Sequence, residues 1–200
     1  VHYMKHLPVG GRDLTEYLMY LMTNSGYAFA TTAERELVRD MKEKMCYVAL
    51  DYAEEEKRAY GGQIPSRTYE LPTGEVMTLN QQRFECTERL FDHAEDDEYN
   101  LINAICNTIA QCPSDTRHRL LQNIVLAGGT TLLPGFAERI KKELDSRFSL
   151  PAKVVAPPER RYSVWLGGSI LAASSHLQPL WISKQEYEEH GPDIVRRKCF

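Results

Sequence analysis

The 200-residue sequence lacks several features that would narrow its function at once. No apolar run reaches the ~18 residues that a membrane-spanning helix needs, and no signal peptide is visible. The five cysteines form no CxxC pair and have no histidine at zinc-finger spacing, which favours reduced thiols in a cytosolic or nuclear compartment without structural zinc. Because the net charge is −4, a nucleic-acid binder or a membrane-surface binder is not expected.

The signatures of common enzyme classes are also missing. The chain contains no HExxH, GxSxG or GxxxxGK[ST] motif and no kinase signature. Its carboxylates lie on predicted loops and helix surfaces, and none stands out as a general acid–base couple. The patterns therefore predict no catalytic residue and no metal ligand.

What is present indicates a globular protein. The chain is 42% hydrophobic and 26% charged, which is ordinary for a folded domain. Its length allows one large domain or two small ones, each with a buried core.

The most informative stretch is 124–135. Residues 124–127 form an apolar run typical of a buried strand, and Gly128 and Gly129 end it with backbone free to adopt positive φ. Pro134 then precedes a predicted helix with Phe136, Ala137, Ile140 and Leu144 on one face. A strand, a glycine turn and a helix can bind phosphate through free N–H groups. The stretch is equally consistent with a tight turn in an ordinary α/β domain, because Gly-Gly is a weak signal.

Capping patterns and apolar spacing predict the other elements. Residue pairs with capping-box spacing are Asp13 with Glu16, Thr31 with Glu34, and Ser183 with Glu186. Helices are also predicted at 81–84, 88–91, 101–109 and 163–173, with Ser114 and Asp115 capping a further short helix. Strands are predicted at 46–50, 67–71, 75–79 and 154–155, the middle two as a hairpin, with an acidic run and a loop at 51–62. The acidic segment 92–98 is predicted to be a solvated loop.

Several segments resemble the actin family: GRDLTEYL (11–18), TTAERELVRD (31–40), CYVALD (46–51), GGTT (128–131), APPER (156–160), YSVW (162–165), GGSILA (167–172) and the ending from WISKQEY (181–187) to RKCF (197–200). The resemblance covers nearly the whole chain and corresponds to the C-terminal half of actin.

The resemblance implies the two-lobed α/β architecture that actin shares with sugar kinases and heat-shock chaperone ATPases, with ATP between the lobes. This chain would supply one large lobe plus a C-terminal segment. Residues 1–10 would end an inner-lobe segment, 11–91 would form the small outer lobe, 92–163 the inner large lobe, and 164–200 a segment that packs on an N-terminal lobe.

The resemblance also implies the adenine and ribose side of a site for ATP or ADP with Mg or Ca. Carried over by motif, its residues are Gly11, Arg39, Lys42, Glu43, Gly128, Gly129, Thr130, Leu132, Leu133 and Arg161. Considered without the resemblance, Arg39, Lys42 and Glu43 would be the solvated face of a helix. The family usually has Met and Tyr where this chain has Leu132 and Leu133. Arg161 stands where Lys is usual, and its guanidinium can stack on adenine.

The family's phosphate-binding hairpins and metal-binding carboxylates would lie upstream of Val1. The chain alone is therefore expected not to hydrolyse ATP, because phosphoryl transfer depends on positioned charge and metal. It would be an ATPase only when completed by an N-terminal half or a complementing chain. Without that half, apolar residues would be uncovered, namely Trp165, Ile170, Leu171, Leu177, Leu180, Trp181 and Tyr187.

Three functions stay open on these grounds. The first is a cytoplasmic, actin-like cytoskeletal protein that binds ATP when complete. Its partners would be other actin-like subunits and actin-binding proteins. The actin-binding proteins would dock at a cleft of which this chain supplies half, through Leu171, Ser174 and Leu180. The second is a non-polymerising, actin-related structural subunit of a larger complex, which need not hold nucleotide. It is suggested by the acidic segment 92–98, which is shorter than the corresponding loop of the family with its apolar plug. Copies of this segment that face each other across a filament would repel each other. The third is a small-molecule kinase of the same superfamily.

Overall fold

The structure is a computed structural model that describes residues 3–29, 31–91 and 100–199. The chain divides into two compact units, Val1–Arg161 (unit 1) and Tyr162–Phe200 (unit 2). The acidic segment 92–98, with the predictions made for it, lies outside the described residues. No helix in the described part of the chain is long and apolar enough to cross a membrane.

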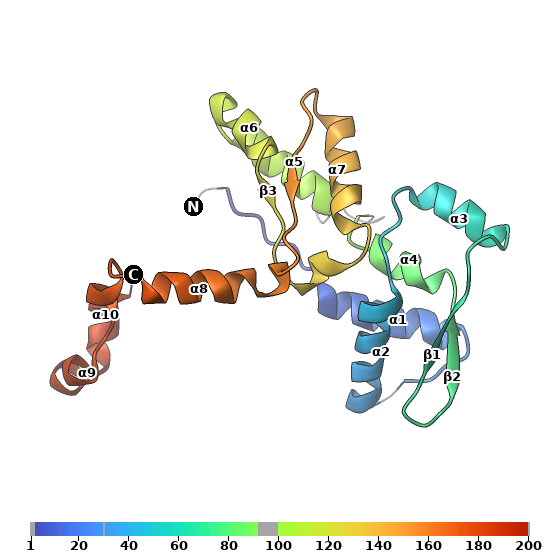
Figure 1. The fold of residues 1–200 in the computed structure, drawn as a ribbon, viewed down its shortest axis with the longest axis horizontal. Helices are drawn as coiled ribbons and strands as arrows, with labels where there is room; N and C mark the ends of the chain where they lie inside the picture. The colour runs from blue at the N-terminus through green and yellow to red at the C-terminus, as the bar shows by residue number, and fades with distance from the viewer. Residues whose placement is uncertain (1–2, 30, 92–99, 200) are drawn as a thin grey trace. The chain divides into compact units, whose positions relative to one another are not determined.

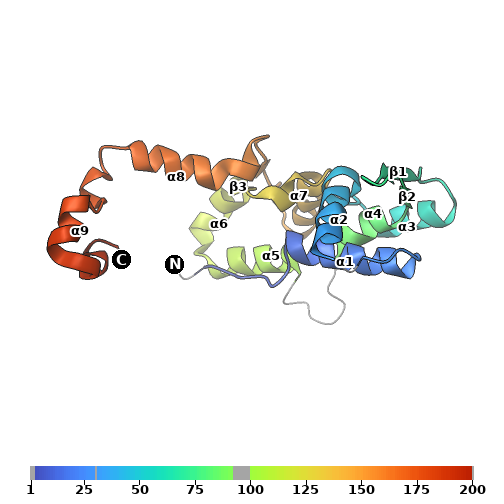
Figure 2. The ribbon, with the colours of Figure 1, turned by 90° about the horizontal axis from the view of Figure 1, so that it is seen from below.

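Unit 1 is mainly helical. Its α-helices are α1 (Gly11–Asn24), α2 (Thr32–Met45), α3 (Tyr52–Tyr60), α4 (Gln82–Glu88), α5 (Leu101–Gln111), α6 (Ser114–Leu121) and α7 (Phe136–Arg147). Figures 1 and 2 show α1, α2 and α4 at one end of this unit and α5 and α6 at the other, with α7 between them. This arrangement brings the end of α2 close to the turn that precedes α7.

Two small sheets complete unit 1. Strands β1 (Arg67–Glu70) and β2 (Val76–Leu79) pair antiparallel, which confirms the predicted hairpin. Strands β3 (Ile124–Val125) and β4 (Val154–Val155) pair in parallel. The predicted strand at 124–127 is thus only two residues long, because its pairing with the other strand of the sheet ends at Val125. Helices and small sheets together make a mixed α/β fold.

The core of unit 1 forms where the apolar faces of its helices meet the hairpin and the strands. Leu14 and Leu18 from α1 are fully buried, as are Val38 and Met41 from α2. Further buried apolar residues include Met22, Met77, Leu79, Phe84, Ile102, Ile140 and Leu144. The predicted apolar face of α7 is confirmed by the burial of Phe136, Ile140 and Leu144.

The starts of the helices follow local capping chemistry. Thr31 accepts from the Glu34 N–H, and the Glu34 carboxylate accepts from the Thr31 N–H at 2.7 Å, which confirms the predicted capping box of α2. The prediction for α1 is wrong by one turn. Gly10 is the N-cap, and Asp13 is the third helical residue, whose carboxylate accepts from the Gly10 N–H at 2.8 Å.

Other local predictions are also corrected. Residues 46–50 form no strand, because the segment has isolated hydrogen bonds, Tyr47 N–H to Arg83 O and Val48 N–H to Pro134 O, and no strand ladder. The predicted loop after Asp51 is the helix α3, which the Asp51 side chain caps. The short helices predicted at 81–84 and 88–91 are one helix, α4, followed by a turn. Pro113, whose side chain cannot cap, is the N-cap of α6.

Unit 2 consists of short helices with little core. It contains α8 (Ser163–Ala173), a 3-10 turn η4 (Gln178–Leu180), α9 (Lys184–His190), a 3-10 turn η5 (Gly191–Asp193) and α10 (Ile194–Lys198). The predicted capping box of Ser183 and Glu186 is confirmed at the start of α9. Of the described residues in this unit, only Ile194 is buried. The apolar residues predicted to be uncovered are exposed, except that Leu177 is half-buried.

Candidate functional site

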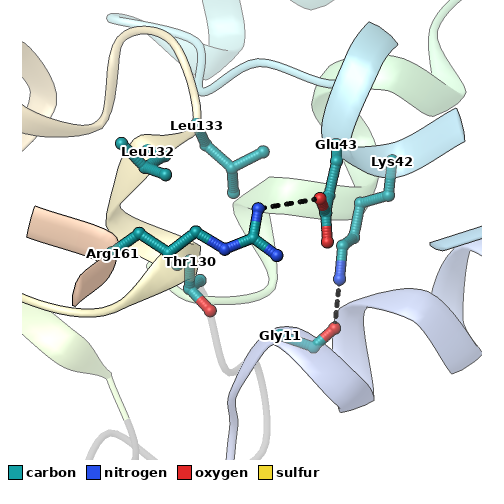
Figure 3. A pocket seen from close by; sticks show the side chains of 8 residues that line it. Gly11, Lys42, Glu43, Thr130, Leu132, Leu133 and Arg161 are labelled. Atoms are coloured by element: carbon teal, nitrogen blue, oxygen red, sulfur yellow. Dashed lines mark hydrogen bonds and ion pairs between the residues drawn. The ribbon is translucent and has the colours of Figure 1, made fainter. Parts of the chain in front are cut away.

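A cavity of about 340 Å³ lies between α1, α2 and the turn after β3 in unit 1. Eight of the described residues line it, and all eight belong to the predicted nucleotide-binding set: Gly11, Lys42, Glu43, Gly129, Thr130, Leu132, Leu133 and Arg161. Figure 3 shows Lys42 and Glu43 projecting side by side from α2, with Thr130, Leu132, Leu133 and Arg161 facing them. The fold therefore gathers residues that are more than a hundred positions apart in the sequence.

Lys42 forms the polar floor of the cavity. The residue is 7% exposed, and its ammonium donates to the Gly11 carbonyl and, at 2.8 Å, to Thr15 Oγ1. Burial lowers the pKa of this ammonium, because the charged form loses hydration. An ammonium has three donors, and two of them are used by these bonds. The third donor has no acceptor among the described residues and is available to a ligand.

Arg161 and Glu43 stand on opposite walls of the cavity. The guanidinium Nη1 lies 3.5 Å from Glu43 Oε2, and both side chains are nearly half exposed (Figure 3). A pair of this exposure is held weakly, so either group can exchange its partner for a ligand. The carboxylate can accept from hydroxyl or amino groups, and the planar guanidinium can stack on a flat ring.

Close packing of Gly11 against the Thr130 side chain shapes the end of the cavity near α1. A Cβ atom at Gly11 would lie 2.7 Å from Thr130 Oγ1, so any other residue would force Thr130 to shift. Glycine at this position lets α1 approach the turn after β3. In that turn, Gly128 has a positive φ of 92°, as its sequence predicts, whereas Gly129 does not.

Arg160 and Thr15 support the site but were not among its predicted residues. The guanidinium of Arg160 donates to Thr131 O at 2.9 Å and to Pro157 O at 3.0 Å, while its carbonyl accepts from the Gly128 N–H at 2.8 Å. Arg160 thus fixes the glycine turn in place. No sequence spacing indicates this role. The role of Thr15 could have been inferred, because it lies one helical turn after Gly11 on the same face of α1.

The remaining predicted site residues lie elsewhere. Arg39 on α2 is ion-paired with Glu36 at 2.7 Å and does not line the cavity. Gly128 directly precedes the lining residues Gly129 and Thr130 in the turn but does not itself line the cavity. The predicted partner cleft lies in unit 2, where Leu171 and Leu180 are exposed and Ser174 ends α8.

The described part of the chain offers no cluster of three or more His, Cys, Asp or Glu side chains that could hold a metal ion. What the cavity presents is one carboxylate, two cations, a threonine hydroxyl and two leucine side chains. This mixture suits a ligand with one flat apolar face and a polar edge.

Comparison with known families agrees with the sequence resemblance. The family model for actin matches residues 2–200. The chain therefore belongs to the actin family. Members of this family usually bind a nucleotide with a divalent cation, and the mixed α/β fold is consistent with an actin-like architecture.

Proposed function

We propose that this chain contributes the adenine and ribose side of an ATP or ADP site in an actin-like cytoskeletal protein. The single observation that carries the proposal is the cavity lining: eight of the residues predicted by motif surround one cavity. In the proposed arrangement, Glu43 accepts from the ribose hydroxyls. Arg161 and Leu132 contact the adenine ring, and the third donor of Lys42 meets a ligand oxygen.

Arg39 and Gly128 have supporting roles in this proposal. Arg39 lies one turn before Glu43 on α2 and becomes available to a nucleotide when its pairing with Glu36 opens. Gly128 holds the turn that presents Gly129 and Thr130. Within the family architecture we assign 11–91 to the small outer lobe, 92–163 to the inner lobe and 164–200 to a segment that packs on an N-terminal lobe.

Nucleotide chemistry requires more polypeptide in this proposal. The described residues hold no metal cluster, and large apolar side chains of unit 2, such as Trp165, Ile170 and Trp181, are exposed. We infer that an N-terminal half or a complementing chain supplies the phosphate side with Mg or Ca, in the cytoplasm. Other actin-like subunits and actin-binding proteins, the latter at Leu171, Ser174 and Leu180, are the proposed partners. The intact mass of the native protein tests this inference, because a mass equal to that of the 200 residues alone, with no companion, contradicts it.

A binding experiment with the chain alone tests the adenine and ribose assignment. Adenosine and ATP should bind with equal affinity by ligand-observed NMR, because the chain contacts only the nucleoside. Glu43→Gln should weaken both about tenfold, since it removes a charge-assisted acceptor. The matched control is Glu36→Gln, which removes the same charge from α2 away from the cavity. No adenosine binding, or equal loss in both variants, contradicts the assignment, and much tighter binding of ATP contradicts the missing phosphate side.

The structural-subunit alternative predicts a different outcome in sedimentation. The completed protein should pellet as a polymer in salt with magnesium and ATP if it is cytoskeletal. No polymer at any concentration would favour a fixed subunit of a larger complex.

A further inference from the structure

A second cavity in unit 1 is rich in basic side chains, and the function proposed above does not use it. It has a volume of about 410 Å³ and lies between the end of α2, α3, the segment before β1, and α4. Its charged lining residues are Lys44, Glu55, Arg58, Arg67 and Arg83. None of them lines the proposed nucleotide cavity. We call this space the Arg83 cavity.

Arg83 is the most buried charge in this cavity, with 7% exposure. Its Nε donates to Met45 O and its Nη1 to Pro65 O, each at 3.0 Å. The guanidinium also lies 5.0 Å from the centre of the Tyr47 ring. These partners hold the group in place but carry no negative charge. Within the described ranges, Arg83 forms no ion pair and its Nη2 donates to no residue.

The other charges around the Arg83 cavity are partly neutralised. Glu55 accepts from the Tyr47 hydroxyl at 2.6 Å and from Arg58 at 2.7 Å. Lys44 is paired with Asp40 at 2.6 Å. The exposed Arg67 has no ion-pair partner among the residues that the structure describes. Two guanidinium groups of the lining, Arg67 and Arg83, therefore form no ion pair with any described carboxylate.

A buried cation without a counter-charge is costly, and it indicates a ligand that supplies one. The forked donors of arginine match the oxygens of carboxylate and phosphate. A single carboxylate would compensate only one of the two guanidiniums. A phosphate monoester carries about −1.5 to −2 at neutral pH and would compensate both.

We propose that the Arg83 cavity binds a doubly charged phosphate group, held by Arg83 and Arg67. The uncharged part of the lining includes Val48, Ile64, Pro65 and Pro134. The one carboxylate among its described residues, Glu55, is already paired with Arg58. The phosphate can be free or can be part of a larger molecule, and the experiment below separates the two sources.

Calorimetric titration of the full chain tests the proposal. Inorganic phosphate should bind saturably at neutral pH under constant ionic strength. Arg67→Gln should weaken this binding about tenfold, because it removes a charge-assisted donor. Arg119→Gln is the matched control, since Arg119 is exposed on α6 and lines neither cavity. Arg83→Gln should abolish binding. Because this change also removes bonds to Met45 and Pro65, circular dichroism must show that the variant folds, and Arg67→Gln carries the test on its own.

Two further ligands define the phosphate source and its charge. Tighter binding of O-phosphoserine than of inorganic phosphate supports the proposal and identifies a phosphorylated side chain or small molecule. Equal affinity supports it and identifies the free anion. Acetate that binds as tightly as phosphate contradicts the charge argument.

The nucleotide proposal and this one fail separately. Phosphate binding that is unchanged in Arg67→Gln but lost in Arg161→Gln would place the anion in the nucleotide cavity and overturn the proposal. Phosphate binding that persists under saturating adenosine supports the proposal for the Arg83 cavity. This result does not depend on whether Glu43→Gln changes adenosine binding, which tests the nucleotide proposal alone.

Discussion

Unit 1 and unit 2 differ in how their apolar side chains are buried. In unit 1, helices, strands and turns from distant parts of the sequence share one core that includes Leu14, Met41 and Leu144. In unit 2, only Ile194 is buried among the described residues, and Trp165 and Ile170 are about 70% exposed. Helix α8, which is apolar on nearly all sides, has no buried residue. A helix of that composition is ordinarily buried on every side.

The local structure of the two units is nevertheless equally well formed. Thr31 caps α2 in unit 1 and Ser183 caps α9 in unit 2, both through complete capping boxes. Capping therefore defines where a helix starts, whereas burial depends on elements that are remote in sequence. Unit 2 therefore has well-capped helices, yet only one of its described residues is buried, so its helices lack a shared core like that of unit 1.

The largest expected difference between the units comes from aromatic truncation. Phe84→Ala removes a side chain of unit 1 that is 1% exposed and should lower the free energy of unfolding by about 3–5 kcal/mol. Trp165→Ala removes a side chain of unit 2 that is 70% exposed and should leave the unfolding midpoint of unit 1 unchanged. Urea unfolding followed by circular dichroism measures both. Equal losses in the two variants would contradict the comparison.

The next largest difference comes from ion pairs. Arg139 and Glu88 in unit 1 pair at 2.8 Å with side chains 9% and 10% exposed, and Arg139 also donates to Ala49 O. Glu88→Gln leaves a buried guanidinium with less compensation and should cost about 3 kcal/mol. In unit 2, Glu188→Gln breaks the exposed pair with Lys184 and should cost less than about 1 kcal/mol.

The same urea measurement decides this second prediction. Charge loss is equal in the two variants, so the difference reports burial. A cost below about 1 kcal/mol for Glu88→Gln would show that the buried pair adds nothing to unit 1.

The smallest expected effect is the loss of stability of α9, in unit 2, when the pH is lowered. Lys198 donates to Glu186 at 2.6 Å and lowers the pKa of that carboxyl to about 2, with help from the Ser183 N–H. Because the pKa of Glu186 is lower in the folded chain than in the unfolded one, the ionised carboxylate stabilises α9 fully at any pH above the ordinary pKa of 4.5. This contribution is lost as the pH falls from there to about 2.

Titration of the Glu186 carboxyl by NMR checks this window. In the unmodified chain, the helicity of α9 should fall as the pH drops through this window. Glu186→Gln should abolish this pH-dependent loss of helicity, whereas Glu188→Gln on the same helix should retain it. An ordinary pKa for Glu186 would show that the contact with Lys198 is not formed in solution.

The candidate site was only partly predictable from the sequence. Its residue types came from motifs shared with the actin family, and Lys42, Glu43 and Arg161 do meet at one cavity. Arg39 shares the same motif, but it is paired with Glu36 and does not line the cavity. Arg160 was missed because its partners, the Thr131 and Pro157 carbonyls, are backbone groups that no residue pattern identifies.

Short stretches of the sequence specify the capping boxes of α2 and α9, the β1–β2 hairpin and the apolar face of α7. These features depend on interactions within a few residues, such as Ser183 with Glu186, so a short stretch contains all the information needed. Contacts between distant parts of the chain, in contrast, establish that 46–50 is not a strand and that Lys42 reaches Gly11 and Thr15. A strand requires a partner strand and a buried ammonium requires nearby acceptors, and both partners are brought close only when the chain folds.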